Sequence, residues 1–190
     1  MPIVPDDKNW TWVLERVCPD CGFDATTFDP LTARGVIEAN ALRWRELLAD
    51  SRATQRPDDN TWSATEYACH VRDVYRLYLL RLELMLYEDG PTFANWDQND
   101  TALTQGYDQA QPHDVAGELH AAAGMLSARY ATVGGAQWQR TGTRSDGAAF
   151  TIDSFTRYLV HDPVHHVWDA EQGYLKLGGP WAPPIGGPVT

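Results

Sequence analysis

Histidine is the residue type in this chain that is best suited to bind a metal ion, and the chain has six of them. His161 and His165 are four residues apart in a segment of helical pattern, so their rings should lie on one face about one turn apart. A divalent ion can bridge such a pair through imidazole nitrogens. The spacing also fits an incidental pair that binds no metal.

His70 is a third candidate ligand, on an earlier helical segment. It lies at the edge of an apolar stripe and could face a cleft between helices. Three imidazoles from two helices would leave coordination positions open, which is typical of catalytic rather than structural metal sites. Glu66 and Asp73 near His70, and Asp169 one turn beyond His165, are candidates to orient a ring N–H.

The remaining histidines are predicted to have no ligand role. His166 is in line with apolar residues of its segment and is interpreted as a core histidine. His113 and His120 fall opposite the apolar stripe of their segment, which indicates two surface residues.

The three cysteines include one Cys-x-x-Cys pair, Cys18 and Cys21. A strong zinc signature would need a second such pair, and a redox motif would need a βαβ setting, and neither is present in the sequence. Two free thiols, a local disulfide and part of an unusual site all remain open, and we favour a structural role. Cys69 is expected to pack in the core.

Four amphipathic helices are expected to position these residues. The second is the best marked, because Ser63 and Glu66 form a capping-box pattern and Asp89-Gly90-Pro91 ends the apolar stripe. The others are expected over residues 30–50, 112–133 and 153–172. A short hairpin around a Ser-Asp-Gly turn is expected before the last helix.

The predicted fold class is all-α, a four-helix bundle over residues 30–175. Residues 1–29 are expected to form an irregular extension that packs on the bundle, and residues 176–190 a Pro/Gly-rich irregular tail.

Length and charge restrict the classes of function. A chain of 190 residues with 43% hydrophobic residues fits one globular domain. Its net charge of −11 disfavours nucleic acid and anionic membrane surfaces as partners. The sequence shows no membrane span and no signal peptide, and its odd cysteine count argues against a secreted disulfide framework. A cytoplasmic protein is therefore expected.

Polar residues on two of the expected helices form a pattern that is seen in a known family. The pattern consists of Trp62-Ser63, Glu66, His70 and Asp73, followed on the last helix by His161, His165 and His166. It resembles the DinB-like four-helix-bundle superfamily, over residues 30–175. This family includes thiol-dependent transferases and isomerases, among them the metal-binding domain of mycothiol-dependent maleylpyruvate isomerase.

The resemblance implies a metal triad of one histidine on the second helix and two residues four apart on the last. Matched to this chain, the triad is His70, His161 and His165, with zinc or nickel as the ion and water or a thiol at the open position. It also implies a homodimer. This chain differs at two points: Pro163 interrupts the last helix, and His161 stands where the isomerase has a glutamate.

These observations support a metal-dependent thiol S-transferase or isomerase that activates a low-molecular-weight thiol, such as mycothiol, against a small-molecule substrate. A coordinated thiol loses its proton and becomes a nucleophile. One alternative is a metal-dependent hydrolase with Glu66, Asp97 or Asp169 as a general base. Another is a non-enzymatic, stress-related binding protein with a vestigial metal site. The sequence assigns no catalytic residue.

Overall fold

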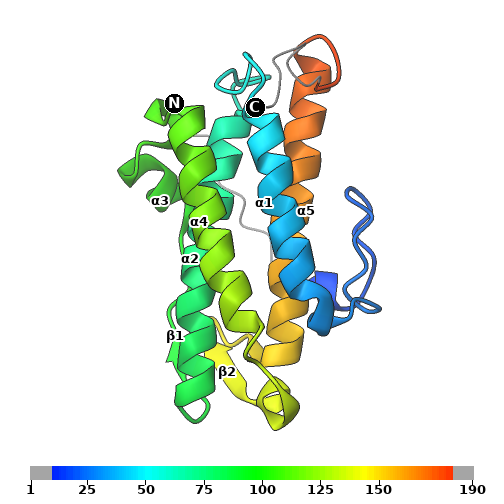
Figure 1. The fold of residues 1–190 in the computed structure, drawn as a ribbon, viewed down its shortest axis with the longest axis vertical. Coiled ribbons are helices and arrows are strands. Elements are labelled where there is room, and N and C mark those ends of the chain that lie inside the picture. Colours follow the sequence, from blue (N-terminus) through cyan, green and yellow to red (C-terminus); the bar gives the residue numbers. More distant parts are fainter. Residues whose placement is uncertain (1–9, 182–190) are drawn as a thin grey trace, which may run out of the picture.

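Four long helices lie side by side in the structure, a computed structural model that describes residues 10–181 (Figure 1). They are α1 (Ala33–Leu47), α2 (Ala64–Tyr87), α4 (Pro112–Tyr130) and α5 (Ile152–Lys176). Both α1 and α2 pack against α4 and against α5. Although α1 and α2 are consecutive in the chain, they therefore lie at diagonally opposite corners of the bundle, with α4 and α5 at the two corners between them.

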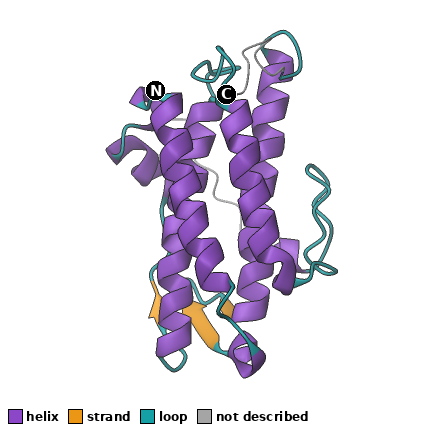
Figure 2. Ribbon diagram, in the orientation of Figure 1, coloured by secondary structure: helices purple, strands orange, loops and turns teal. Residues whose placement is uncertain are grey.

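The bundle also carries short elements that the all-α prediction lacked. A helix, α3 (Gln98–Thr104), lies in the connection between α2 and α4, which was expected to be a loop. Three strands, β1 (Thr92–Phe93), β2 (Thr141–Arg144) and β3 (Ala149–Thr151), form a small sheet at one end of the bundle (Figure 2). β2 and β3 are the expected hairpin, and β1 pairs in parallel with β2. The fold is thus a helical bundle with a small mixed sheet.

The helix ends follow the signals in the sequence. Ser63 Oγ accepts a hydrogen bond from the backbone N–H of Glu66, and the Glu66 carboxylate accepts one from the backbone N–H of Ser63. This reciprocal pair is the predicted capping box, and it starts α2. Thr151 and Ser154 cap the start of α5 in the same way.

The core lies where the apolar stripes of the helices meet. Its largest fully buried side chains include Trp44, Tyr75, Leu119, Leu126 and Phe155, from all four long helices. Among residues 10–181, no helix is long and apolar enough to cross a membrane.

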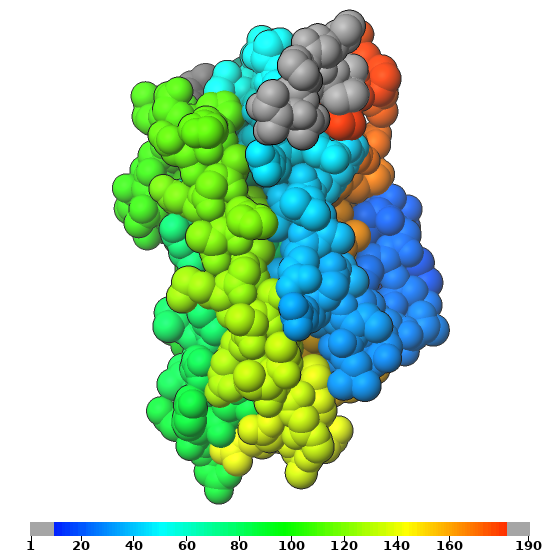
Figure 3. All heavy atoms as spheres, in the orientation of Figure 1, coloured from blue at the N-terminus to red at the C-terminus, as the bar shows by residue number. Residues whose placement is uncertain are grey.

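The segment before the bundle packs along its side. A 3₁₀ helix, η1 (Trp10–Leu14), contacts α5, and Trp10 and Trp12 are half-buried. In a space-filling view this segment forms a ridge next to α1 (Figure 3). It covers a face of α5 that the other long helices leave uncovered.

α5 continues through Pro163, although proline removes one backbone hydrogen bond of the helix. Asn40 of α1 donates from Nδ2 to the Pro163 carbonyl at 2.8 Å. Tyr75 of α2 donates from its hydroxyl to Asn40 Oδ1 at 2.7 Å. These two buried hydrogen bonds join three helices at the level of the candidate site.

Replacing Asn40 with Ala should lower the free energy of unfolding by about 1–3 kcal/mol, because the buried hydroxyl of Tyr75 loses its acceptor. Urea denaturation monitored by circular dichroism measures the change. In a double-mutant cycle, Tyr75→Phe should cost less in the Asn40→Ala background than in the wild type. Full additivity of the two changes would contradict the role of this pair.

Candidate metal centre

Residues 161–166 of α5 present ligand atoms in two directions. His161 and His165 face the N-terminal segment, where their nitrogens group with the sulfurs of Cys18 and Cys21. Asp162 and His166 face α2, where their ligand atoms group with those of His70. Within each group the ligand atoms lie within 4.8 Å of one another. We call the first group the cysteine cluster and the second the bundle cluster.

The predicted set of His70, His161 and His165 is therefore divided between two clusters. His161 and His165 do share one helical face, with ring centroids 5.1 Å apart. A step of one residue rotates a side chain by about 100° around a helix, so the pair at 162 and 166 points elsewhere. In the structure it is this second pair that faces His70.

The bundle cluster brings three ligand atoms to one point. Nε2 of His70 lies 3.4 Å from Oδ1 of Asp162, and Nε2 of His166 lies 3.7 Å from the same oxygen. The two imidazole rings are perpendicular, with centroids 4.7 Å apart. Two imidazole nitrogens and one carboxylate oxygen are a common donor set for zinc.

The bundle cluster also contains buried polar atoms without partners. Within the described residues, neither ring nitrogen of His70 has a hydrogen-bond partner, and neither does Oδ1 of Asp162. His70 is completely buried. An unpaired buried polar group costs about 1–3 kcal/mol. Nε2 of His70 and Oδ1 of Asp162, which lie 3.4 Å apart, therefore fit a cation that would satisfy both atoms.

The protonation states suit metal ligands. Burial lowers the pKa of His70, so its imidazole is neutral at pH 7. Burial acts to raise the pKa of Asp162, but the interactions with His70 and His166 outweigh it and lower this pKa to about 2. A neutral imidazole beside an ionised carboxylate is the state that binds a cation.

Asp169 lies beside one histidine of each cluster. Its Oδ2 lies 2.8 Å from Nδ1 of His166 and 3.7 Å from Nε2 of His165. The bond to Nδ1 leaves Nε2 of His166 to point at Asp162. Asp169 was expected beside His165, and the structure places its hydrogen bond on the neighbouring His166. Such a partner fixes the ring tautomer of a ligand.

The other two expected orienting carboxylates are engaged elsewhere. Glu66 forms an ion pair with Arg56 in addition to its capping bonds. Asp73 accepts hydrogen bonds from Arg72 and from the hydroxyl of Tyr107. Neither contacts a ring nitrogen of His70.

Aromatic side chains enclose the bundle cluster. Trp96 stacks on His70 at a centroid distance of 5.2 Å and an angle of 11°. Tyr67 stacks on His166 at 5.1 Å, and Trp62 packs near His70 at 5.7 Å. Such walls hold the two imidazoles in place and keep water from their faces.

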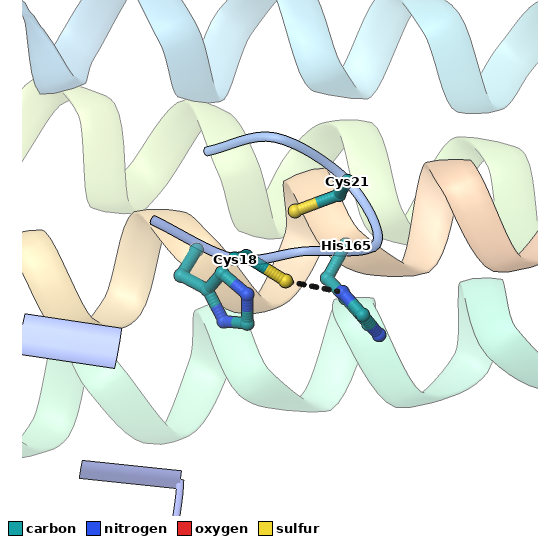
Figure 4. A group of neighbouring side chains, drawn as sticks. Cys18, Cys21 and His165 are labelled. Atoms are coloured by element: carbon teal, nitrogen blue, oxygen red, sulfur yellow. Dashed lines mark hydrogen bonds between the residues drawn. The ribbon is translucent and has the colours of Figure 1, made fainter. Parts of the chain in front are cut away.

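The cysteine cluster involves the same turns of α5, about 100° around the helix from the bundle cluster. Sγ of Cys18 is 3.5 Å from Nδ1 of His165 (Figure 4). His161 and His165 are both buried, and Nε2 of His161 has no partner within residues 10–181. Cys18 and Cys21 are not joined by a disulfide. Burial raises the pKa of Cys21 to about 11, so its thiol is protonated at pH 7 unless a cation lies beside it.

A cavity of about 310 Å³ adjoins both clusters. Asp162 and His166 line it from the bundle cluster, and His161 and His165 line it from the cysteine cluster. The rest of its wall is aromatic or polar and includes Trp10, Asp20, Trp62, Tyr67, Tyr158, Trp168 and Asp169. Its volume suits a small molecule.

Two interpretations of single histidines have different outcomes. His113 and His120 are exposed, as predicted. The interpretation of His166 as a core histidine is wrong, because its ring is half-buried beside His70 and Asp162. The missed signal was that Asp162 and His166 are also four residues apart and also form a ligand pair.

Comparison with known proteins agrees with this architecture. The DinB superfamily matches residues 37–170 of the chain. The fold is similar to that of YfiT from Bacillus subtilis, with a TM-score of 0.70 and 19% sequence identity over 80% of this chain and 87% of YfiT. YfiT is described as a probable metal-dependent hydrolase with an unusual four-helix bundle topology. No curated protein sequence matches the chain at a significant level. Because the family match covers more than half of its length, the chain belongs to the DinB superfamily.

Proposed function

We propose that this protein is a metal-dependent enzyme whose ion is held by His70, Asp162 and His166. The observation that carries the proposal is that Nε2 of His70 and Oδ1 of Asp162, two buried atoms without a hydrogen-bond partner in the described part of the chain, meet beside His166. Two imidazoles and one carboxylate suit zinc or nickel. Three protein ligands leave a position for a small molecule, and the adjoining cavity gives access to it.

Thiol transfer is the reaction that we favour. A divalent ion at this position would lower the pKa of a thiol or water and supply a nucleophile at neutral pH. Asp162 is a carboxylate four residues before His166, so the ligand pair is a carboxylate and a histidine. This is closer to the glutamate-containing set of the resembling isomerase than His161 and His165 are. Mycothiol, bacillithiol and glutathione are the candidate thiols.

The residues around the bundle cluster have separate tasks in this proposal. Asp169 holds His166 so that Nε2 faces the ion. Trp62 and Tyr67 line the cavity beside the two imidazoles and exclude water from one side of the substrate. Asp20 lines the same cavity with an exposed carboxylate.

Hydrolysis is the second candidate reaction. Asp20 could accept a proton from a water molecule in the cavity, which is the task of a general base. The description of YfiT as a probable metal-dependent hydrolase on a similar fold also favours this candidate. The requirement for an added thiol distinguishes the two reactions.

Metal content tests the ligand assignment. Protein purified without a His tag should contain zinc or nickel, and His166→Ala should contain one ion fewer per chain, because the bundle cluster loses a ligand. Mass spectrometry measures the metal concentration, and division by the protein concentration gives the number of ions per chain. His113→Ala is the matched control, since His113 is exposed and far from either cluster, and its metal content should equal that of the wild type. Equal metal content in His166→Ala and the wild type would refute the assignment.

A screen of the metal-loaded protein tests the reaction. Thiols should be consumed with electrophilic small molecules, and turnover should fall to background in His166→Ala but persist in His113→Ala. Loss of thiol and formation of conjugate or isomer are measured by chromatography. Turnover without any thiol would identify hydrolysis instead. No turnover with either would favour a non-enzymatic binding protein.

Replacing Asp169 with Asn should weaken metal affinity by about 10- to 100-fold, because the charged acceptor that fixes the tautomer of His166 becomes a neutral amide that can also donate. Competition with a chelator measures the affinity. Asp153→Asn is a matched control on the same helix, where Asp153 pairs with Arg157 and touches neither cluster. An affinity like that of the wild type in Asp169→Asn would show that His166 is oriented by other contacts.

A further inference from the structure

The cysteine cluster lies partly outside the region that defines the family. Cys18 and Cys21 precede residue 37, where the family match begins, whereas His161 and His165 belong to α5 within it. The cluster therefore joins a segment outside the family match to the bundle within it. None of its four residues is a ligand of the ion proposed above.

The backbone of the Cys18–Cys21 loop is folded so that both thiols face α5. The N–H of Gly22 donates to the Cys18 carbonyl at 3.0 Å, and the N–H of Cys18 donates to the Phe23 carbonyl at 2.9 Å. Gly22 has φ +74°, in the left-handed region that favours glycine. This tight turn places two sulfurs from one short loop beside one helix (Figure 4).

The distances fit a tetrahedral ion. With zinc–sulfur bonds of about 2.3 Å and zinc–nitrogen bonds of about 2.0 Å, ligand atoms of a tetrahedral site lie roughly 3.3–3.8 Å apart. The Cys18 sulfur and Nδ1 of His165 are 3.5 Å apart, and all four ligand atoms lie within 4.8 Å of one another. Small side-chain rotations would bring the four atoms to the ideal spacing.

An independent observation also indicates a ligand here. Nε2 of His161 is buried and has no hydrogen-bond partner in the described part of the chain, and His161 is only 4% exposed. A neutral imidazole nitrogen in this position satisfies its lone pair when it binds a cation. The opposite nitrogen of His165 faces Asp169, 3.7 Å away, as the outer partner of a metal-bound histidine does.

The surroundings indicate a closed site. The ring of Trp10 packs on His161 and His165 at centroid distances of 5.7 and 5.3 Å, and Phe23 packs on His161 at 6.0 Å. Cys18 is 1% exposed. Four protein ligands complete the coordination of zinc and leave no position for a substrate, which is the character of a structural site.

We propose that Cys18, Cys21, His161 and His165 form a second, structural zinc site. It fastens residues 10–29 to α5. Through this segment it also sets the cavity wall formed by Trp10 and Asp20. Each of the two clusters holds its own ion, so the protein contains two ions per chain.

Cobalt substitution tests this site separately from the bundle cluster. Metal-free protein titrated with Co²⁺ should show thiolate-to-cobalt charge-transfer absorption in the near ultraviolet, because only the cysteine cluster offers sulfur. The absorption should be absent in Cys18→Ser/Cys21→Ser and unchanged in Cys69→Ala, which removes a buried thiol outside the cluster. It should also persist in His166→Ala, whose missing ion belongs to the bundle cluster.

Zinc content and protease digestion complete the test. Cys18→Ser/Cys21→Ser should contain one zinc fewer per chain than the wild type, and its segment 10–29 should be cut faster by trypsin. The single variant Cys21→Ser, at a half-buried position, should show a clearly weaker absorption even where the double variant does not fold, because only the Cys18 sulfur remains in the cluster. No charge-transfer absorption in the wild type, a disulfide between Cys18 and Cys21 in freshly purified protein, or full zinc content in the double variant would each overturn the proposal.

Discussion

The orientation of α5 about its own axis is the constraint on which both candidate sites depend. Phe155 and Leu159 pack into the core and fix this orientation. Asp162 and His166 then point to His70 on α2, while the neighbouring positions point to the N-terminal segment. A rotation of α5 by one residue, about 100°, would turn Asp162 and His166 away from His70. The buried bonds among Asn40, Tyr75 and the Pro163 carbonyl hold the helix at this level.

One carboxylate connects the two clusters. Oδ2 of Asp169 contacts Nδ1 of His166 and approaches Nε2 of His165, so each ring presents its other nitrogen to its own cluster. A hydrogen bond from one ring nitrogen to a carboxylate makes the opposite nitrogen a better ligand. With an ion in each proposed site, the charge on one ion would act on the ligands of the other through Asp169.

Much of the fold followed from local signals in the sequence. The Ser63–Glu66 capping box, four apolar stripes and the Ser-Asp-Gly turn predicted the long helices and the β2–β3 hairpin. The parallel pairing of β1 was not predictable, because two residues carry no periodic pattern. Helical spacing also showed that His161 and His165 share a face, but it gives only relative angles. It could not show which face of α5 meets His70, nor that Cys18 lies beside a histidine 147 positions further along the chain.

The difference between the clusters indicates how the molecule divides its tasks. The bundle cluster has three ligands, adjoins the cavity and lies within the part of the chain that the family shares. The cysteine cluster has four ligands and depends on residues before that part. A three-ligand ion can accept a substrate, whereas a four-ligand ion cannot without losing a protein ligand. In the proposed arrangement, chemistry would belong to the bundle cluster, and the N-terminal segment, held by the four-ligand site, would shape the cavity through Trp10 and Asp20.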